Sequence, residues 1–253
     1  MINIKTEEEI KIMREAGKRL AGVLDVLKTF PREGMTTIEI DAFARKLIEE
    51  GGSKPAFLGY KPYGAARAYP FTTCISLNST VVHGLPSEYI LQNGDLLKID
   101  LGLIYEKYYA DMAITLPIGS VSAEAKKLMA VTEEVLYLGI KEVQAGKHLG
   151  DIGFAIHSRV KSAGFSIVDS LTGHGIGKKL HEDPYVFNFG KPGEGERLVP
   201  GMVLALEPMT AAGKRAVQQL DDDSFVTADD SLSAHFEHTV LVTEGDPEIL
   251  TSL

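Results

Sequence analysis

Four carboxylates occur in or directly after stretches of residues that are otherwise apolar or β-branched. They are Asp100 after residues 96–99, Asp111 within 108–116, Glu207 after 203–206 and Glu237 within 234–242. A single acidic residue in such a stretch is usually exposed or ion-paired. A buried carboxylate needs a partner, because moving an unpaired charge out of water is costly. Four such residues in one chain therefore indicate a shared site.

Asp100 and Asp111 are predicted to face each other in a hairpin. A two-residue turn at Tyr105 and Glu106 would place them directly opposite, with Cβ atoms about 5 Å apart. Two like charges at that separation destabilise a sheet unless a cation lies between them. Tyr-Glu is not a favoured turn pair, and the alternative is the solvent-exposed face of an edge hairpin.

Histidine completes the set of potential ligands. His174 lies in the glycine-rich segment 173–177, and His181 follows seven residues later. An isolated histidine is more often a structural residue, but two beside carboxylates at strand ends indicate a site. Oxygen ligands with one imidazole suit manganese, iron or cobalt and tolerate zinc. Four carboxylates exceed the needs of one ion, which favours two ions about 3.5–4 Å apart that share carboxylates and activate a water.

Two pairs of helices are predicted to position these residues. Residues 6–9 and 36–39 have the form of capping boxes, which begin helices. Apolar residues then recur at steps of three and four, as on one buried helix face. The residues predicted to face inward are Ile10, Met13, Ala16, Leu20, Val23, Leu24 and Leu27 in the first helix, and Leu128, Met129, Val135, Leu136, Ile140, Ile152, Ala155, Ile156 and Val160 in the second helix pair. The first pair ends near Pro31 and Gly51, and a second pair runs from Ser122 to Gly146 and from about Asp151 to Gly164.

A strand is predicted after each helix pair, at residues 96–100 and 202–207. In both strands a carboxylate lies six residues after a turn glycine, and a His-Gly pair precedes the strand. These pairs are His83-Gly84 and His174-Gly175. The pattern predicts a duplicated helix–helix–strand unit whose carboxylates meet between the halves. Chance similarity of two ordinary α+β segments is the alternative.

The composition is that of a folded globular protein. The 253 residues include 26 Lys+Arg and 35 Asp+Glu, a net charge of −9, and 44% are hydrophobic. This length allows one large domain or two small ones, and the acidic balance disfavours binding to nucleic-acid phosphates. The single cysteine, Cys74, excludes an intrachain disulfide and a cysteine-rich zinc module. The sequence has no signal-peptide pattern and no apolar run of membrane-spanning length, so we expect a cytoplasmic protein without a membrane partner.

The sequence resembles the type I methionine aminopeptidases over nearly its whole length. The resemblance rests on residues 4–17, on the segment 75–86 with the Lys-Ile-Asp at 98–100, on 173–184, on the Leu-Glu-Pro-Met at 206–209 and on 231–239. It implies a single pita-bread α+β domain over residues 1–253. Two halves related by a pseudo-twofold axis, about 1–118 and 119–253, would surround a central antiparallel sheet.

The resemblance also implies a reaction and roles for particular residues. It implies hydrolytic removal of the initiator methionine from nascent chains, near the ribosome exit, when the second residue is small. A monomer with two ions of cobalt, manganese, iron, zinc or nickel is expected, with Asp111 and Glu237 bridging them. By resemblance the ligands are Asp100, Asp111, His174, Glu207 and Glu237; the catalytic residues are His83, His181 and Glu207; and the substrate pocket holds His83, His181, Phe57, Tyr60, Tyr69 and Cys74.

Two departures from the family pattern affect the rim of the predicted pocket. The link at residues 61–68 is longer than in the family, and the chain has no tryptophan, where the family usually has one near residues 222–225.

Two alternative functions remain at this point. A proline-directed peptidase of the same fold usually carries a further N-terminal domain, for which we expect no room in 253 residues. A non-catalytic relative that binds partners or RNA would have lost ligands, yet all five are present.

Overall fold

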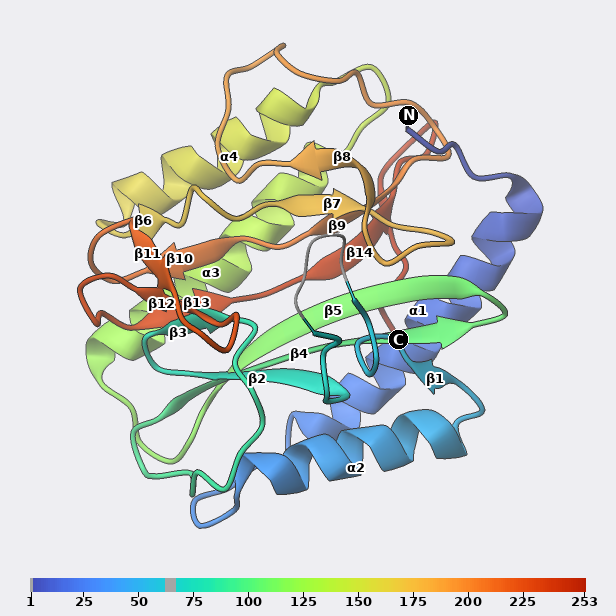
Figure 1. Ribbon diagram of the computed structural model, residues 1–253. Coiled ribbons are helices and arrows are strands. Elements are labelled where there is room, and N and C mark those ends of the chain that lie inside the picture. The colour runs from blue at the N-terminus through green and yellow to red at the C-terminus, as the bar shows by residue number, and fades with distance from the viewer. Residues whose placement is uncertain (1, 62–66) are drawn as a thin grey trace.

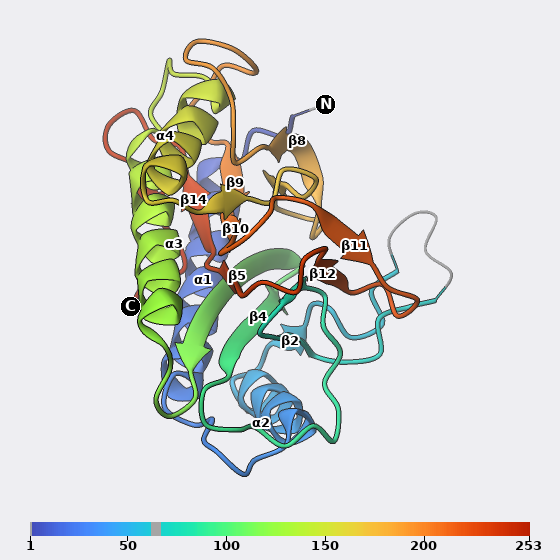
Figure 2. The same cartoon turned by 90° about the vertical axis from the view of Figure 1, so that its left-hand side faces the viewer.

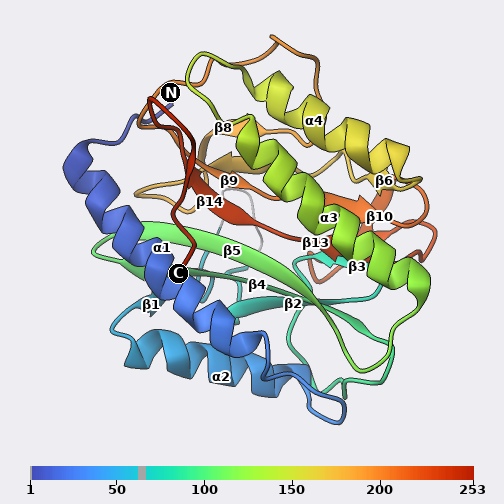
Figure 3. The same cartoon turned by 180° about the vertical axis from the view of Figure 1, so that it is seen from behind.

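Within the described part of the chain, four helices lie against the strands of two larger antiparallel sheets (Figure 1). The computed structural model describes residues 2–61 and 67–253. Figure 3 shows two of the helices crossing the back of the strands, with one further helix at each end of the molecule. The helices are α1 (Glu7–Leu27), α2 (Thr37–Glu50), α3 (Ala123–Lys141) and α4 (Leu149–Ser162).

The helix starts confirm the predicted capping residues. At the start of α1, the Glu9 amide donates to Thr6 Oγ1 (3.3 Å) and the Thr6 amide donates to Glu9 Oε2 (2.8 Å). A second capping box begins α2, and Ser122 caps α3. Helix α4 begins two residues before the predicted position, because the Asp151 carboxylate accepts a hydrogen bond from the His148 amide and so continues the helix back to Leu149.

Each helix pair precedes one of the larger sheets, which confirms the predicted order of elements. The four-stranded sheet comprises β1 (Lys54–Pro55), β2 (Thr73–Leu77), β4 (Leu96–Tyr105) and β5 (Tyr108–Pro117). The five-stranded sheet has the order β15 (Glu248–Ile249), β14 (His238–Leu241), β9 (Val203–Leu206), β7 (Gly173–Gly175) and β8 (Glu182–Val186).

Two small antiparallel sheets complete the structure. One contains β6 (Ser166–Ile167), β10 (Met209–Ala211) and β13 (Ser233–His235), and the other contains β3 (Thr80–Val82), β11 (Val217–Gln219) and β12 (Phe225–Thr227). Figure 2 shows α1, α3 and α4 on one side of the strands, with β8, β11 and β12 toward the other side. Among the described residues, no helix is both long and apolar enough to span a membrane.

The predicted turn of the β4–β5 hairpin is wrong by one residue, which shifts the predicted strand pairing by two residues. The turn consists of Glu106 and Lys107, whose φ angles of 46° and 73° are positive, as in the two-residue turns that match strand twist. Consequently Asp100 pairs with Ala113, and Asp111 pairs with Gly102. Because side chains alternate faces with a period of two, both aspartates still share one face as diagonal neighbours.

The two halves of the chain are joined beside these aspartates. The Asp111 amide donates to Thr239 Oγ1 (3.1 Å), and the Thr239 hydroxyl donates to the Asp111 carbonyl oxygen (2.8 Å). The Glu237 amide donates to the carbonyl oxygen of Ala113 (2.9 Å). The β4–β5 hairpin of the first half therefore fixes the position of the segment of the second half that carries Glu237.

Candidate metal centre

The five predicted ligands line one cavity of about 760 Å³ between the two halves. The hairpin strands β4 and β5 carry Asp100 and Asp111, and β7 carries His174. Glu207 directly follows β9, and Glu237 lies between β13 and β14. Strands that are distant in sequence thus bring their polar side chains to one place.

Three of these residues form a compact group. One ligand atom from each of Asp111, His174 and Glu237 lies within 4.8 Å of the others, and all three residues are buried. Glu207 adjoins the group, since its Oε1 lies 3.6 Å from His174 Nε2. His174 Nε2 is also 4.0 Å from Asp111 Oδ2. Spacings of this size suit several ligands around one small cation.

The orientation of His174 leaves one nitrogen available as a ligand. Its Nδ1 lies 2.9 Å from the carbonyl oxygen of Gly175. A carbonyl can only accept a hydrogen bond, so Nδ1 carries the proton and Nε2 presents its lone pair toward the carboxylates. Burial lowers the pKa of His174 to about 4, which keeps the ring neutral at pH 7. Fixing the tautomer through the second ring nitrogen is typical of metal-binding histidines.

The carboxylates destabilise one another's charged forms. Burial, together with neighbouring negative charge, raises the pKa values of Asp100, Glu207 and Glu237 well above their usual range, and burial raises that of Asp111 to about 7. Within residues 2–61 and 67–253, the buried oxygens Asp100 Oδ1 and Glu237 Oε1 have no hydrogen-bond partner. Several buried oxygens and one imidazole lone pair, gathered at one place, fit a divalent cation.

His83 and His181 lie at the open side of the same cavity. The ring of His181 is 4.4 Å from that of His174, centroid to centroid, and nearly perpendicular to it. Shielding from water and the two neighbouring histidines lower the pKa of His181, and shielding also lowers the pKa of His83. Both are therefore neutral at pH 7, and neither belongs to the compact group around His174.

The predicted substrate pocket forms the apolar end of the cavity. Phe57, Tyr60, Tyr69 and Cys74 all line it. The Tyr69 hydroxyl donates to the carbonyl oxygens of Thr73 (2.9 Å) and Gly84 (3.1 Å), which fixes the ring. Near the position where the family has tryptophan, Asp222, Asp223 and Phe225 line the cavity. Of the longer link at 61–68, residues 62–66 lie outside the described residues.

The structure adds His235, to which the sequence analysis gave no role. His235 is 1% exposed, and its Nε2 lies 3.4 Å from Glu207 Oε2. Neither ring nitrogen has another hydrogen-bond partner among the described residues. One signal was available in the sequence, because residues two apart in an extended segment share a face, and His235 precedes Glu237 by two.

Comparisons with known proteins agree with this geometry. Residues 11–244 match metallopeptidase family M24, and the chain belongs to that family. It is 46% identical to the methionine aminopeptidase of Clostridium perfringens and 43% identical to methionine aminopeptidase 1 of Bacillus subtilis, over 99% of each chain. These relatives confirm the resemblance to methionine aminopeptidases and, with the family, the use of a divalent metal.

Solved structures support the same fold. The crystal structure of methionine aminopeptidase from Thermotoga maritima superimposes with a TM-score of 0.95, at 40% identity and with complete coverage of both chains. Prolidase from Pyrococcus horikoshii gives a TM-score of 0.79 at 24% identity, covering 98% of this chain but 63% of the prolidase chain. The likeness to both confirms the predicted pita-bread α+β fold.

Proposed function

We propose that this protein hydrolytically removes the N-terminal methionine from peptides and nascent proteins whose second residue is small, with two divalent ions bound. The observation that carries the proposal is the buried group of Asp111, His174 and Glu237 beside an apolar pocket. The full-length similarity to methionine aminopeptidases supports the substrate. Cobalt, manganese, iron, zinc and nickel are the candidate ions.

Five residues would hold the ions. Asp100 and Asp111 would bind from the first half, and His174 would bind through Nε2. Glu207 and Glu237 would bind from the second half. By resemblance to the methionine aminopeptidases, Asp111 and Glu237 would serve both ions, and both belong to the compact group. Divalent ions at such a centre supply Lewis acidity, which activates water and polarises a carbonyl.

Glu207 is the general base and acid in this proposal. It lies at the edge of the group, with Oε1 near His174 and Oε2 near His235. From there it can take a proton from the attacking water and pass it to the departing amine. His235 Nε2, 3.4 Å from Glu207 Oε2, would help to keep this carboxylate in one orientation.

His181 is the proposed donor to the scissile carbonyl oxygen. Its Nδ1 lies 2.8 Å from the Tyr60 hydroxyl oxygen, and the pKa of that phenol is raised by burial, so the phenol keeps its proton. If the phenol donates to Nδ1, the neutral ring carries its proton on Nε2, which can then donate to an oxygen that gains negative charge. His83, at the same open side of the cavity, is positioned to contact the peptide.

A peptidase assay with metal analysis tests the proposal. The protein would be loaded with each candidate metal in turn, its metal content measured, and its rates compared on Met-Ala-Ser and on an Xaa-Pro peptide. We expect about two ions per chain and cleavage of Met-Ala-Ser. Met-Ile-Ser, with a large second residue, should be a much poorer substrate. Preferential cleavage of the Xaa-Pro peptide, or full activity after complete metal removal, would contradict the proposal.

A further inference from the structure

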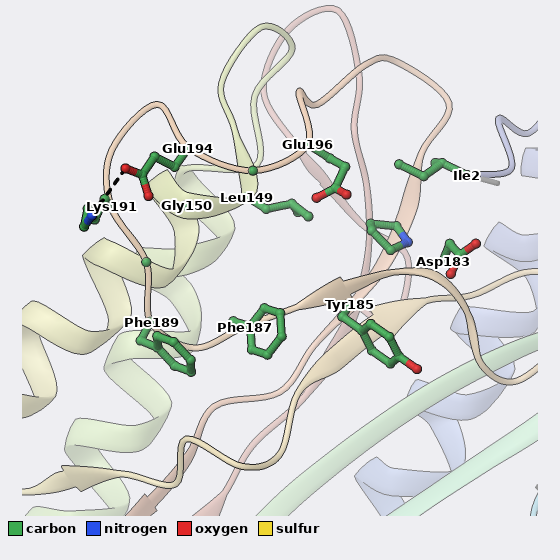
Figure 4. Close-up of a pocket in the computed structure, with 13 residues that line it drawn as sticks. Ile2, Leu149, Gly150, Asp183, Tyr185, Phe187, Phe189, Lys191, Glu194 and Glu196 are labelled. Carbon is green, nitrogen blue, oxygen red and sulfur yellow. Dashed lines mark hydrogen bonds and ion pairs between the residues drawn. The ribbon is translucent and has the colours of Figure 1, made fainter.

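Three aromatic side chains form an exposed row beside the metal centre. Tyr185, Phe187 and Phe189 are 68%, 43% and 39% exposed, while the residues between them, Val186 and Asn188, are buried. Neighbouring rings lie 6.5 Å and 5.3 Å apart, centroid to centroid. Figure 4 shows the three rings side by side along the segment. A continuous apolar surface of this kind usually marks an interaction site.

The row begins next to a proposed metal ligand. Tyr185 in β8 pairs with His174 in β7, so both side chains leave the same face of the sheet. Phe187 and Phe189 continue from Tyr185 at steps of two residues, away from the centre. Strand β8 is at the edge of its sheet, and among the described strands only β7 pairs with it. Beyond β8, the backbone carbonyls of Phe187 and Phe189 lie against α4, so only the rings of these two residues face outward.

A groove of about 540 Å³ runs along this edge. Its other wall contains Leu149 and Gly150 from α4 together with Glu194 and Glu196 from the loop that follows β8 (Figure 4). Tyr185 also lines the cavity that contains the metal centre, and so does Asp183, which borders the groove as well. The groove thus adjoins the proposed active site and shares two lining residues with it.

The backbone of the aromatic segment packs directly against helix α4. A Cβ atom at Gly153 of α4 would lie 2.3 Å from the carbonyl oxygen of Phe189 and 2.7 Å from that of Phe187. The helix and the segment can approach this closely only because Gly153 has no side chain. The row is consequently formed before any ligand binds, which reduces the entropic cost of binding to it.

We propose that this row binds the substrate's own chain downstream of the methionine, by contact of the peptide's side chains with the three aromatic rings. The inference rests on the proposed function. Successive rings lie 6.5 Å and 5.3 Å apart, so the row matches about three to four extended residues of a peptide. Three acidic side chains, Asp183, Glu194 and Glu196, line the groove with one basic side chain, Lys191. The 3.5 Å ion pair between Lys191 and Glu194 offsets one charge of each sign, so the lining keeps a net negative charge. The groove therefore favours basic side chains in this part of the substrate.

Peptide length is the experimental variable that tests the row. The metal-loaded enzyme would be assayed on Met-Ala-Ser and on the heptapeptide Met-Ala-Ser-Lys-Val-Lys-Val. We expect the heptapeptide to have a kcat/KM about tenfold higher, which corresponds to about 1.4 kcal/mol. The gain should come from a lower KM at unchanged kcat, because contacts remote from the reacting bond bind ground state and transition state alike.

Two surface variants distinguish an effect of this row from a general effect of removing exposed aromatic side chains. Phe187→Ser/Phe189→Ser should lose the length-dependent gain while cleaving Met-Ala-Ser at the wild-type rate. Phe154→Ser is the matched control, since Phe154 is 48% exposed on α4 and does not border the groove. It should keep the gain. Thermal melting of all three proteins verifies that each is folded.

Other outcomes would overturn the inference. Retention of the full gain in the double variant would show that the peptide leaves by another route. Conversion of a wild-type dimer to a monomer by the double variant, measured by sedimentation, with the length dependence unchanged, would assign the row to a second copy of the chain. Failure of the wild type to cleave Met-Ala-Ser would instead contradict the proposed function. Binding of a fluorescently labelled heptapeptide to wild type and double variant would then still test the row.

Discussion

The hydroxyl oxygen of Tyr60 lies 2.8 Å from Nδ1 of His181, and their rings meet edge to face with centroids 5.4 Å apart. This contact joins the proposed methionine pocket in the first half of the chain to the proposed carbonyl donor in the second half. A single pair of residues thereby couples recognition of the side chain to orientation of the imidazole.

Removal of either partner should lower kcat without removing metal. His181→Ala should reduce kcat by about 10²–10³, or roughly 3–4 kcal/mol, as loss of an oxyanion donor does. Tyr60→Phe keeps the imidazole but frees its orientation, so we expect a smaller loss of about tenfold. Steady-state kinetics and metal titration would measure both effects. Loss of metal from His181→Ala as severe as from His174→Ala would assign His181 to the ligand set instead.

The bridging carboxylates should control how much metal the protein holds. Asp111→Ala or Glu237→Ala removes a ligand shared by both ions, so each variant should lose at least one ion per chain and nearly all activity. Glu244→Ala, a carboxylate remote from the cavity, is the control and should keep both. Elemental analysis would measure the metal content of each variant, and a peptide hydrolysis assay would measure its activity. Wild-type activity at wild-type metal content in either site variant would exclude that residue as a bridge.

The sequence predicted the elements and the candidate ligands more accurately than their mutual geometry. Capping boxes and apolar spacing depend on neighbours in the chain, and the residues predicted to be inward on α1 are all buried. On α3 and α4, Met129 and Ala155 were predicted to face inward but are half-buried. A helix face is wider than the contact that a neighbouring element makes with it, so its margins stay partly exposed.

Two other features depend on contacts that sequence spacing does not encode. The hairpin register follows from the turn at Glu106 and Lys107, where two ordinary residues adopt positive φ because strand twist requires it. The contact between His235 and Glu207 joins β13 to the end of β9. Its existence depends on how the small sheets pack beside the large ones, and no local pattern reports that packing.

Glu9 should make the protein's stability sensitive to acid. Its carboxylate accepts hydrogen bonds from Lys178 Nζ (2.7 Å), the Tyr108 hydroxyl (2.8 Å) and the Thr6 amide (2.8 Å). The hydrogen bond from Lys178, followed by the other two, lowers the pKa of Glu9 to about 2. A depressed carboxyl pKa stabilises the fold above the unfolded-state pKa, and this contribution is lost as pH falls toward the folded-state value.

Glu9→Gln should therefore reduce the free energy of unfolding by about 1 kcal/mol at pH 7. The difference from wild type should shrink as pH falls from about 4.5 toward 2. Urea denaturation at pH 7, 5, 4 and 3 would measure it, with Glu49→Gln as the control for an exposed ion pair within one helix. A difference that stays constant over this range would show that Glu9 acts through packing rather than charge.

His235 should act on the metal through Glu207. A donor on Nε2, 3.4 Å from Glu207 Oε2, would hold that oxygen and leave Oε1 toward His174 and the ions. Residues that orient a ligand in this way typically contribute 10–100-fold to metal affinity. We therefore expect His235→Ala to weaken binding of the metal by about tenfold or more, measured by calorimetric titration of the metal-free protein.

His235→Gln, whose amide can donate at a similar position, should restore most of the affinity. His157→Ala, at an exposed histidine of α4, controls for loss of an imidazole elsewhere. Equal affinities in His235→Ala and wild type would remove His235 from the centre, whereas a loss that glutamine does not restore would indicate direct coordination by the imidazole.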